Sequence, residues 1–103
     1  MTLRQKQSKF ASMLARLILH AETLGYEVTM GECWRHPTAT HGAANSLHKH
    51  RLAVDLNLFK NGRYLRSTAA HEPLGIYWES IGGAWGGRFE DGNHYSLEHN
   101  GRR

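Results

Sequence analysis

Cysteine is almost missing from this chain, and long apolar runs are missing altogether. Cys33 is the only cysteine among 103 residues, which excludes an intrachain disulfide and a four-cysteine zinc site. We expect this side chain to be a small buried residue. No run approaches the roughly 20 apolar residues that span a membrane. Charged residues interrupt the N-terminal apolar stretch, so we expect synthesis in the cytoplasm without a signal peptide.

The charge balance is basic, and histidine is abundant. The formal net charge is +4 with a pI near 9.6, which suits an anionic polymer as partner, either nucleic acid or an acidic bacterial envelope. Lys and Arg are spread along the chain and do not indicate a nucleic-acid-binding stripe. Eight histidines exceed ordinary usage and favour metal chemistry, although phosphate-like ligands and pH sensing also use histidine.

The hydrophobic pattern predicts one α+β domain over residues 1–103. The expected elements, in chain order, are a helix over 3–24, a strand over 26–34, a loop over 35–47, a strand over 51–58, a short strand over 63–65, a helix from Ser67 or Thr68, and a strand over 93–98. Asn61-Gly62 indicates a tight turn between two strands, and Pro73 fits a first helical turn. We therefore expect a small, mainly antiparallel sheet with the long N-terminal helix packed on one face.

Alternation along the strand over 51–58 separates its apolar side chains from its polar ones. Four side chains of one parity are expected to be buried: Leu52, Val54, Leu56 and Leu58. Asp55 points to the opposite face, with the small Ala53 as its neighbour there. On the last strand, His94 also lies opposite the core positions. The polar face of the sheet, away from the helix, is thus the expected position of any chemistry.

Three metal-competent side chains are expected together on that face: Asp55, His94, and His48 from the loop that enters the strand. Three protein ligands with an open fourth position are typical of a catalytic zinc, where the fourth ligand is water. Asp91 could act as the base for that water without binding the metal. Arg35 is a candidate to stabilise the oxyanion of a tetrahedral intermediate. A plain polar sheet face without metal remains the alternative.

Two motifs in this order resemble a known family. Ser46-x-His48-x-x-x-x-Ala53-x-Asp55, followed by Asp91-x-x-His94, is similar to the zinc D-alanyl-D-alanine peptidases and L-alanyl-D-glutamate endopeptidases of the M15 type, which include several phage endolysins. The family pattern is S-x-H-x-x-G-x-A-x-D with a later acid-x-x-His. This chain departs from it at Arg51, which stands where the family has glycine.

The resemblance implies a role for each matching residue. The zinc ligands would be His48, Asp55 and His94, and Asp91 would be the general base. Arg35 would contact the substrate carbonyl or its oxyanion, and Ser46 would line the substrate site. The implied cofactor is Zn²⁺. His50 could compete with His48 as a ligand, but it lacks the serine two positions earlier.

The resemblance also implies a zinc-dependent peptidoglycan peptidase of phage or prophage type, an endolysin that hydrolyses a stem-peptide bond with zinc-activated water. The L-alanyl-D-glutamate bond is the expected target, and D-Ala-D-Ala carboxypeptidase activity is the nearest alternative. Stem peptides of peptidoglycan are then the partners, with no nucleic acid and no membrane span, and we expect a monomer. Such a lysin would reach the wall, in the periplasm, only after another protein breaches the membrane.

Two other classes of function stay open. A His-rich nuclease could use Asp91-Gly-Asn-His94 and His99-Asn100 in a ββα-metal site; the basic pI supports it, but it gives the stretch from Ser46 to Asp55 no role. A non-catalytic, zinc-bound module could recognise wall peptides, although binding alone needs no base such as Asp91. Trp85 is either a core residue or an aromatic wall of the substrate cleft.

Overall fold

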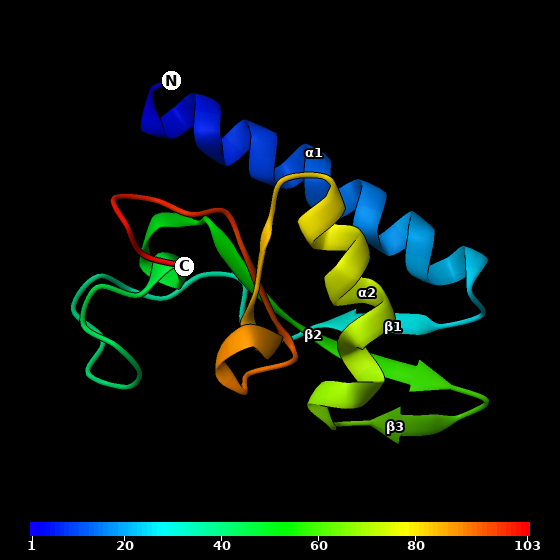
Figure 1. Ribbon diagram of the computed structural model, residues 1–103. Helices are drawn as coiled ribbons and strands as arrows, with labels where there is room; N and C mark the ends of the chain where they lie inside the picture. Colours follow the sequence, from blue (N-terminus) through cyan, green and yellow to red (C-terminus); the bar gives the residue numbers. More distant parts are fainter.

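Two helices and a five-stranded sheet form the α+β architecture of the computed structural model, which describes residues 1–103 (Figure 1). The helices are α1 (Leu3–Thr23) and α2 (Thr68–Ser80), with short 3₁₀ helices η1 (Leu47–His50) and η2 (Gly86–Phe89). The strands are β1 (Glu27–Met30), β2 (Ala53–Lys60), β3 (Arg63–Leu65), β4 (Ala84–Trp85) and β5 (His94–Ser96). The fold class expected from the sequence is confirmed.

Local sequence signals set the ends of both helices. Thr2 caps α1 in a capping box, in which its Oγ1 accepts from the Gln5 N–H while its own N–H donates to the Gln5 side chain. Gly25 follows α1 with φ of +86°, a left-handed value suited to glycine. Ser67 caps α2 at Ala70. Because α2 begins at Thr68, Pro73 lies inside the helix and not in its first turn, contrary to the sequence expectation.

The sheet is antiparallel throughout, with the order β1-β2-β5-β4, and β3 also pairs with β2. β2 begins at Ala53, later than expected, because residues 47–50 form η1 and Arg51 takes a left-handed conformation. β2 continues to Lys60, where Asn61 and Gly62 turn the chain with φ of +52° and +76°. The β2–β5 register places Asp55 directly opposite His94.

The core lies between the two helices and one face of the sheet. The expected inward set of β2 is confirmed, since each of these side chains is at most 1% exposed: Leu52, Val54, Leu56 and Leu58. From α1, Phe10 meets the Trp78 ring of α2 edge-on at 5.7 Å, and Trp78 in turn meets Tyr95 of β5 at 6.1 Å. This chain of aromatic contacts joins both helices to the strand that carries His94.

Cys33 is exposed, so the expectation of a buried cysteine is wrong: the residue follows the end of β1, where the chain leaves the core. Neither helix combines the length and the apolarity that crossing a lipid bilayer requires.

A buried polar pair links α2 to β5. His71 is 1% exposed and Tyr95 is fully buried, and the Nδ1 of His71 lies 2.8 Å from the Tyr95 hydroxyl. Burial lowers the pKa of His71, and a backbone contact with Leu65 opposes this shift only in part. His71 is therefore neutral in the folded protein at pH values where an exposed histidine is protonated.

Acid is expected to weaken the fold through His71. The folded-state pKa lies below the ordinary 6.5, so the contribution of His71 is complete above that pH and is lost as pH falls towards the folded-state value. A His71→Phe variant lacks this dependence. Urea unfolding between about pH 7.5 and pH 5 should show the stability advantage of wild type over variant falling, by at most about 1.4 kcal/mol per pH unit. A constant difference would contradict the prediction.

Candidate metal centre

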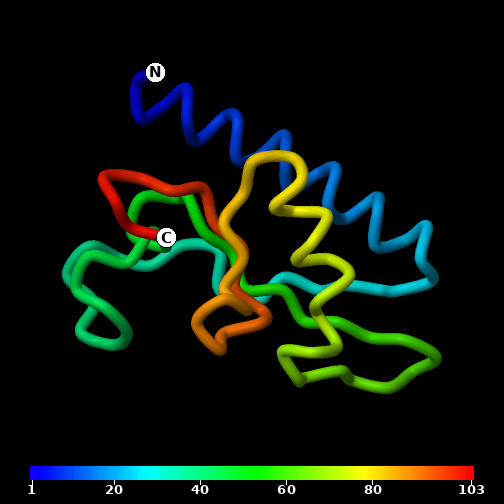
Figure 2. Tube along the Cα trace, viewed as in Figure 1, coloured from blue at the N-terminus to red at the C-terminus, as the bar shows by residue number.

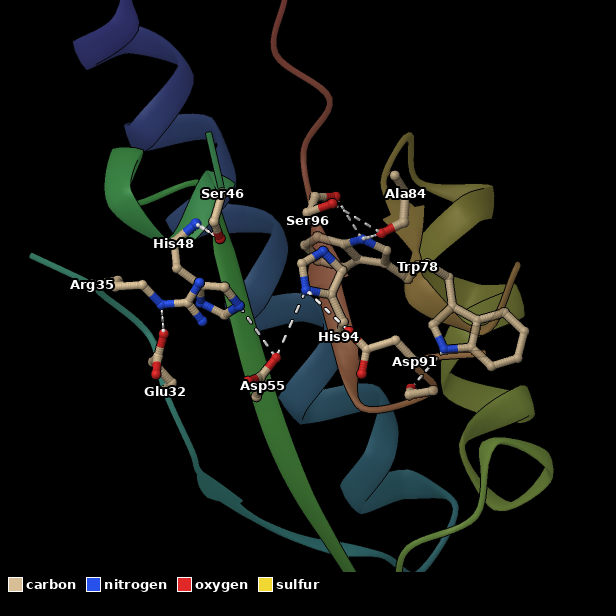
Figure 3. A network of polar contacts seen from close by, with 12 residues as sticks. Glu32, Arg35, Ser46, His48, Asp55, Trp78, Ala84, Asp91, His94 and Ser96 are labelled. Carbon is tan, nitrogen blue, oxygen red and sulfur yellow. Dashed lines mark hydrogen bonds and ion pairs between the residues drawn. The ribbon is translucent and has the colours of Figure 1, made fainter. Parts of the chain in front are cut away.

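The structure brings His48, Asp55 and His94 together on the polar face of the sheet (Figure 3). Each offers one ligand atom, and these atoms all lie within 4.8 Å of one another. Both histidines are nearly buried, at 3% and 6% exposure, while the Asp55 side chain keeps 27%. The cluster therefore reaches solvent on the side of the carboxylate.

Two of the three spacings between donor atoms suit a shared tetrahedral ion. Oδ1 of Asp55 lies 3.3 Å from Nε2 of His48 and 3.7 Å from Nδ1 of His94. Zinc ligands about 2.0–2.2 Å from the metal stand roughly 3.3–3.6 Å apart at tetrahedral angles, so both distances suit neighbouring ligands. Burial opposes ionisation of Asp55, but its contacts with the two histidines outweigh burial and lower its pKa to about 2. The carboxylate is thus ionised at neutral pH, as a metal ligand must be.

Neither imidazole has a hydrogen-bond partner on its outward side. The outward ring nitrogens, Nδ1 of His48 and Nε2 of His94, are buried and form no hydrogen bond. Packing between rings restrains the two imidazoles instead. Their centroids lie 5.4 Å apart, and the centroid of the Phe89 ring lies 5.7 Å from that of His94. A cation between the three donors would fix both ring orientations, so ion binding and local order are expected to be coupled.

Local structure before β2 positions His48. Ser46 is buried and caps η1, with its Oγ accepting from the His48 N–H at 3.3 Å. The backbone of Arg35 donates to the His48 carbonyl at 3.0 Å, which ties η1 to the segment after β1. Arg51 then ends η1 with φ of +57°. Ser46 orients the loop that carries His48, and its predicted contact with substrate stays a prediction.

A close approach of backbones positions His94 and Asp91. A Cβ atom at Gly86 would lie 2.2 Å from the Asp91 carbonyl oxygen and 2.6 Å from the His94 Cβ, so only glycine fits there. Asp91 donates its N–H to the Gly86 carbonyl at 2.9 Å, and His94 donates to the Asp91 carbonyl at 3.0 Å. The glycine-rich stretch 82–87 thus packs against the backbone that carries Asp91 and His94.

Trp85 belongs to the core and does not line a cleft. Its side chain is 3% exposed, and Cβ atoms built at Gly75 and Gly87 would collide with its ring. Its indole N–H donates to the Gly92 carbonyl at 2.8 Å, beside Asp91. Of the two roles considered from the sequence, the structure supports the core residue, and substrate contact by Trp85 is not retained. Its effect on the site is indirect, through the turn that carries Asp91.

Asp91 lies beside the cluster without belonging to it. Its Oδ2 is 3.9 Å from Nδ1 of His94, and its side chain is 52% exposed. The group of potential ligands contains only His48, Asp55 and His94. The Asp91 carboxylate is thus open to water beside the candidate ligands, and its role as a general base stays a prediction.

Arg35 lies on the opposite side of the cluster from Asp91 in the view of Figure 3. Its Nε donates to Glu32, whose other carboxylate oxygen is 3.2 Å from Nε2 of His41. Burial opposes the ionisation of Glu32, but Arg35 and His41 outweigh it and lower its pKa. The Nη1 group of Arg35 packs against Gly42, where a Cβ would lie 2.2 Å away. Glu32, which sequence reasoning missed, therefore holds Arg35 in place.

The remaining histidines lie outside the cluster. His50 packs against His99 at 5.5 Å between ring centroids, so it does not compete with His48. His20 stacks on Tyr77, and the His36 ring accepts from the Thr38 N–H and lies edge-on to Trp34. The ββα-metal site considered from the sequence would need His99 beside His94, but His99 is not in the ligand group.

The α+β fold thus carries a His/Asp/His group that could hold a metal ion. The sequence profile of a protein family described as D-alanyl-D-alanine carboxypeptidase, an M15-type peptidase family, matches residues 39–97, more than half of the chain. The chain belongs to this family. The matched residues include both motifs but not Arg35. No curated protein matches the chain significantly.

An alanine at position 86 is expected to disturb the candidate metal centre. The backbone of Gly86 does not need positive φ, so the new methyl group acts only by pushing on Asp91 and His94. We expect zinc affinity to fall about 10- to 100-fold, with a loss of roughly 1–3 kcal/mol in stability from overpacking. Zinc titration and urea unfolding measure the two effects.

Gly62→Ala is the matched control. It adds a Cβ at φ of +76° with no atom within 4 Å, far from the cluster in the β2–β3 turn. It should cost about 1 kcal/mol of stability and leave zinc affinity unchanged. Equal zinc affinity in the two variants would show that Gly86 does not support the site.

Proposed function

We propose that this protein is a zinc-dependent peptidoglycan peptidase that hydrolyses a stem-peptide bond of the bacterial cell wall. The observation that carries the proposal is the convergence of His48, Asp55 and His94, open to solvent, with Asp91 beside it but outside the ligand set. Membership of the M15-type family supports a peptidase acting on peptidoglycan. Three protein ligands leave one position for a reactant, as in catalytic zinc sites, whereas structural sites close all four.

His48, Asp55 and His94 would hold the zinc ion, and the donor set fits it in type, spacing and charge. When bound, zinc supplies a Lewis acid that lowers the pKa of water towards 7 and polarises a carbonyl group. The ionised Asp55 offsets part of the positive charge. Both imidazoles are neutral when they act as ligands.

Asp91 would accept the proton of the attacking water and later donate it to the leaving amine. Its half-exposed carboxylate can meet both groups at the open side of the cluster. Arg35 would donate from Nη to the substrate carbonyl oxygen as negative charge develops there, because Glu32 takes Nε and leaves the other donors available. Asp91 and Arg35 lie on opposite sides of the cluster in the view of Figure 3, which supports this division of roles. Ser46 would border the substrate next to His48.

The L-alanyl-D-glutamate bond is the proposed target, and the terminal D-Ala-D-Ala bond is the alternative. Support for an endopeptidase comes from the resemblance to phage endolysins and from the Asp55 side of the cluster, which is open to solvent. We propose that the chain acts as a single-domain monomer on the wall, from the periplasmic side, after release through a breached membrane. The positive net charge would favour adhesion to the acidic envelope.

Two substitutions should separate metal binding from proton transfer. His94→Ala is expected to lose both zinc and hydrolysis. Asp91→Asn should keep one zinc per chain and lose about 10²–10⁴-fold in hydrolysis rate, because only the base is removed. His36→Ala is the control, since this exposed histidine lies outside the group of potential ligands. Elemental analysis and the release of muropeptides from purified peptidoglycan are the measurements. An Asp91→Asn variant with full activity would remove Asp91 from the mechanism.

Chelation should abolish hydrolysis and lower Tm, and added zinc should restore both. Binding to the folded state alone contributes about 2.7 kcal/mol when free zinc is 100 times its Kd. Mass spectrometry of the products then identifies the bond: a new D-glutamate amino terminus indicates the endopeptidase, and free D-alanine indicates the carboxypeptidase. A protein that binds zinc but leaves all stem peptides intact would be a binding module, against our proposal.

A further inference from the structure

A small pocket separate from the metal centre lies where three distant parts of the chain meet. It has a volume of about 110 Å³ and is lined by residues of the η1 region and of the C-terminal segment: Asn45, Leu47, His50, His99, Asn100 and Arg102. Lys6 of α1 borders this region, with Nζ 3.2 Å from Nδ1 of His99. Figure 2 shows the C-terminal segment running beside the chain around residue 50.

The chain holds this junction together with specific contacts. Gln7 of α1 donates to the His50 carbonyl at 2.8 Å, and His99 pairs through its backbone with Arg102 in an isolated β-bridge, with both N···O distances 2.9 Å. The centroids of the His50 and His99 rings, which both line the pocket, lie 5.5 Å apart. None of these contacts involves the metal cluster, so the pocket is a feature of the fold in its own right.

The pocket is basic, and no carboxylate neutralises it. Its lining contains two imidazoles, a guanidinium and two carboxamides but no Asp or Glu. Neither Lys6 nor Arg102 forms an ion pair with an acidic side chain, whereas Arg35 and Arg88 each do. Burial, followed by the like charges of Lys6 and His50, lowers the pKa of His99. An anion in the pocket would relieve this repulsion.

We propose that this pocket is a binding site for a phosphate group, independent of the peptidase centre. Its volume is far below the 300–1,000 Å³ typical of sites for whole organic ligands, so it suits one small anion or the end group of a larger molecule. Both lining segments carry nitrogen donors, Asn45 and His50 on one and Asn100 and Arg102 on the other, with the Lys6 ammonium next to His99. Such an arrangement matches the several acceptor oxygens of a tetrahedral phosphate better than the two of a carboxylate.

The side chains of η1 separate the two sites. His48 points to the metal cluster, while Leu47 and His50 on the same short element line the phosphate pocket. A phosphate-bearing polymer or lipid held there would anchor the protein to an anionic surface with the candidate metal centre close by. The binding itself does not depend on hydrolysis, so this proposal can fail while the proposed function stands, and the reverse.

Calorimetric titration of the full chain with inorganic phosphate at low ionic strength tests the site. The test variant is Lys6→Gln with Arg102→Gln, and the control is Lys9→Gln with Arg103→Gln. The control removes the same charge from exposed positions of the same two segments, outside the pocket lining. We expect the control to bind like wild type and the test variant to lose about tenfold or more in affinity, because two charge-assisted contacts are removed. Acetate should bind more weakly than phosphate.

Equal phosphate affinity in the test and control variants would overturn the proposal, and it is also the result expected if phosphate binds only at the metal centre. Because Lys6 contacts His99, the test variant could lose stability, so a second measurement uses wild type alone. Phosphate should shift the NMR signals of the His50 and His99 rings and not that of His36; shifts absent from both rings would equally overturn it. Poly(glycerol phosphate) and phosphatidylglycerol vesicles, titrated separately, then distinguish a wall polymer from a lipid as the source of the phosphate.

Discussion

The candidate site depends on one register, the pairing of β2 with β5 that places Asp55 opposite His94. The neighbouring Leu56 N–H donates to the Asn93 carbonyl, so Asp55 and His94 form a non-hydrogen-bonded pair, the kind in which side chains lie closest. A slip by one residue would turn Asp55 into the core and Leu56 out to solvent. The buried leucines of β2 therefore protect the register, and with it the geometry of the cluster.

Large aromatic side chains and glycines support that register from the core side. Trp78 of α2 donates its indole N–H to the carbonyls of Ala84 and Ser96, which joins the helix to both β4 and β5 (Figure 3). Trp85 similarly holds the turn at Gly92. Each indole needs glycine neighbours to fit, Gly83 against Trp78 and Gly75 and Gly87 against Trp85. The same packing that stabilises a 103-residue domain thus also restrains the candidate site.

Patterns within single elements were predictable from the sequence, and contacts between elements were not. Periodicity was sufficient for α1, and strand parity for the face of Asp55, because each depends only on local geometry. The burial of Trp85, the exposure of Cys33 and the clamp of Glu32 on Arg35 depend on how distant segments meet. His48 could be predicted as a ligand because its motif is local in the sequence. The close approach of Gly86 to Asp91 and His94 could not be predicted, because it exists only in the folded chain.

Arg51 shows that the turn after His48 needs a backbone conformation and not glycine itself. The position has φ of +57°, the left-handed region that glycine enters without strain, in agreement with the glycine of the resembling motif. Arginine there costs about 1–3 kcal/mol. Its guanidinium lies 5.0 Å from the centre of the Trp34 ring, and such a cation–π contact returns roughly 0.5–1 kcal/mol at an exposed site. Contacts on both sides of the turn offset the remaining conformational cost. These are the Ser46 cap before the turn and the pairing of β2 after it, which fix the positions of His48 and Asp55. The turn is therefore kept by its surroundings, and the departure from the motif leaves the candidate ligands in place.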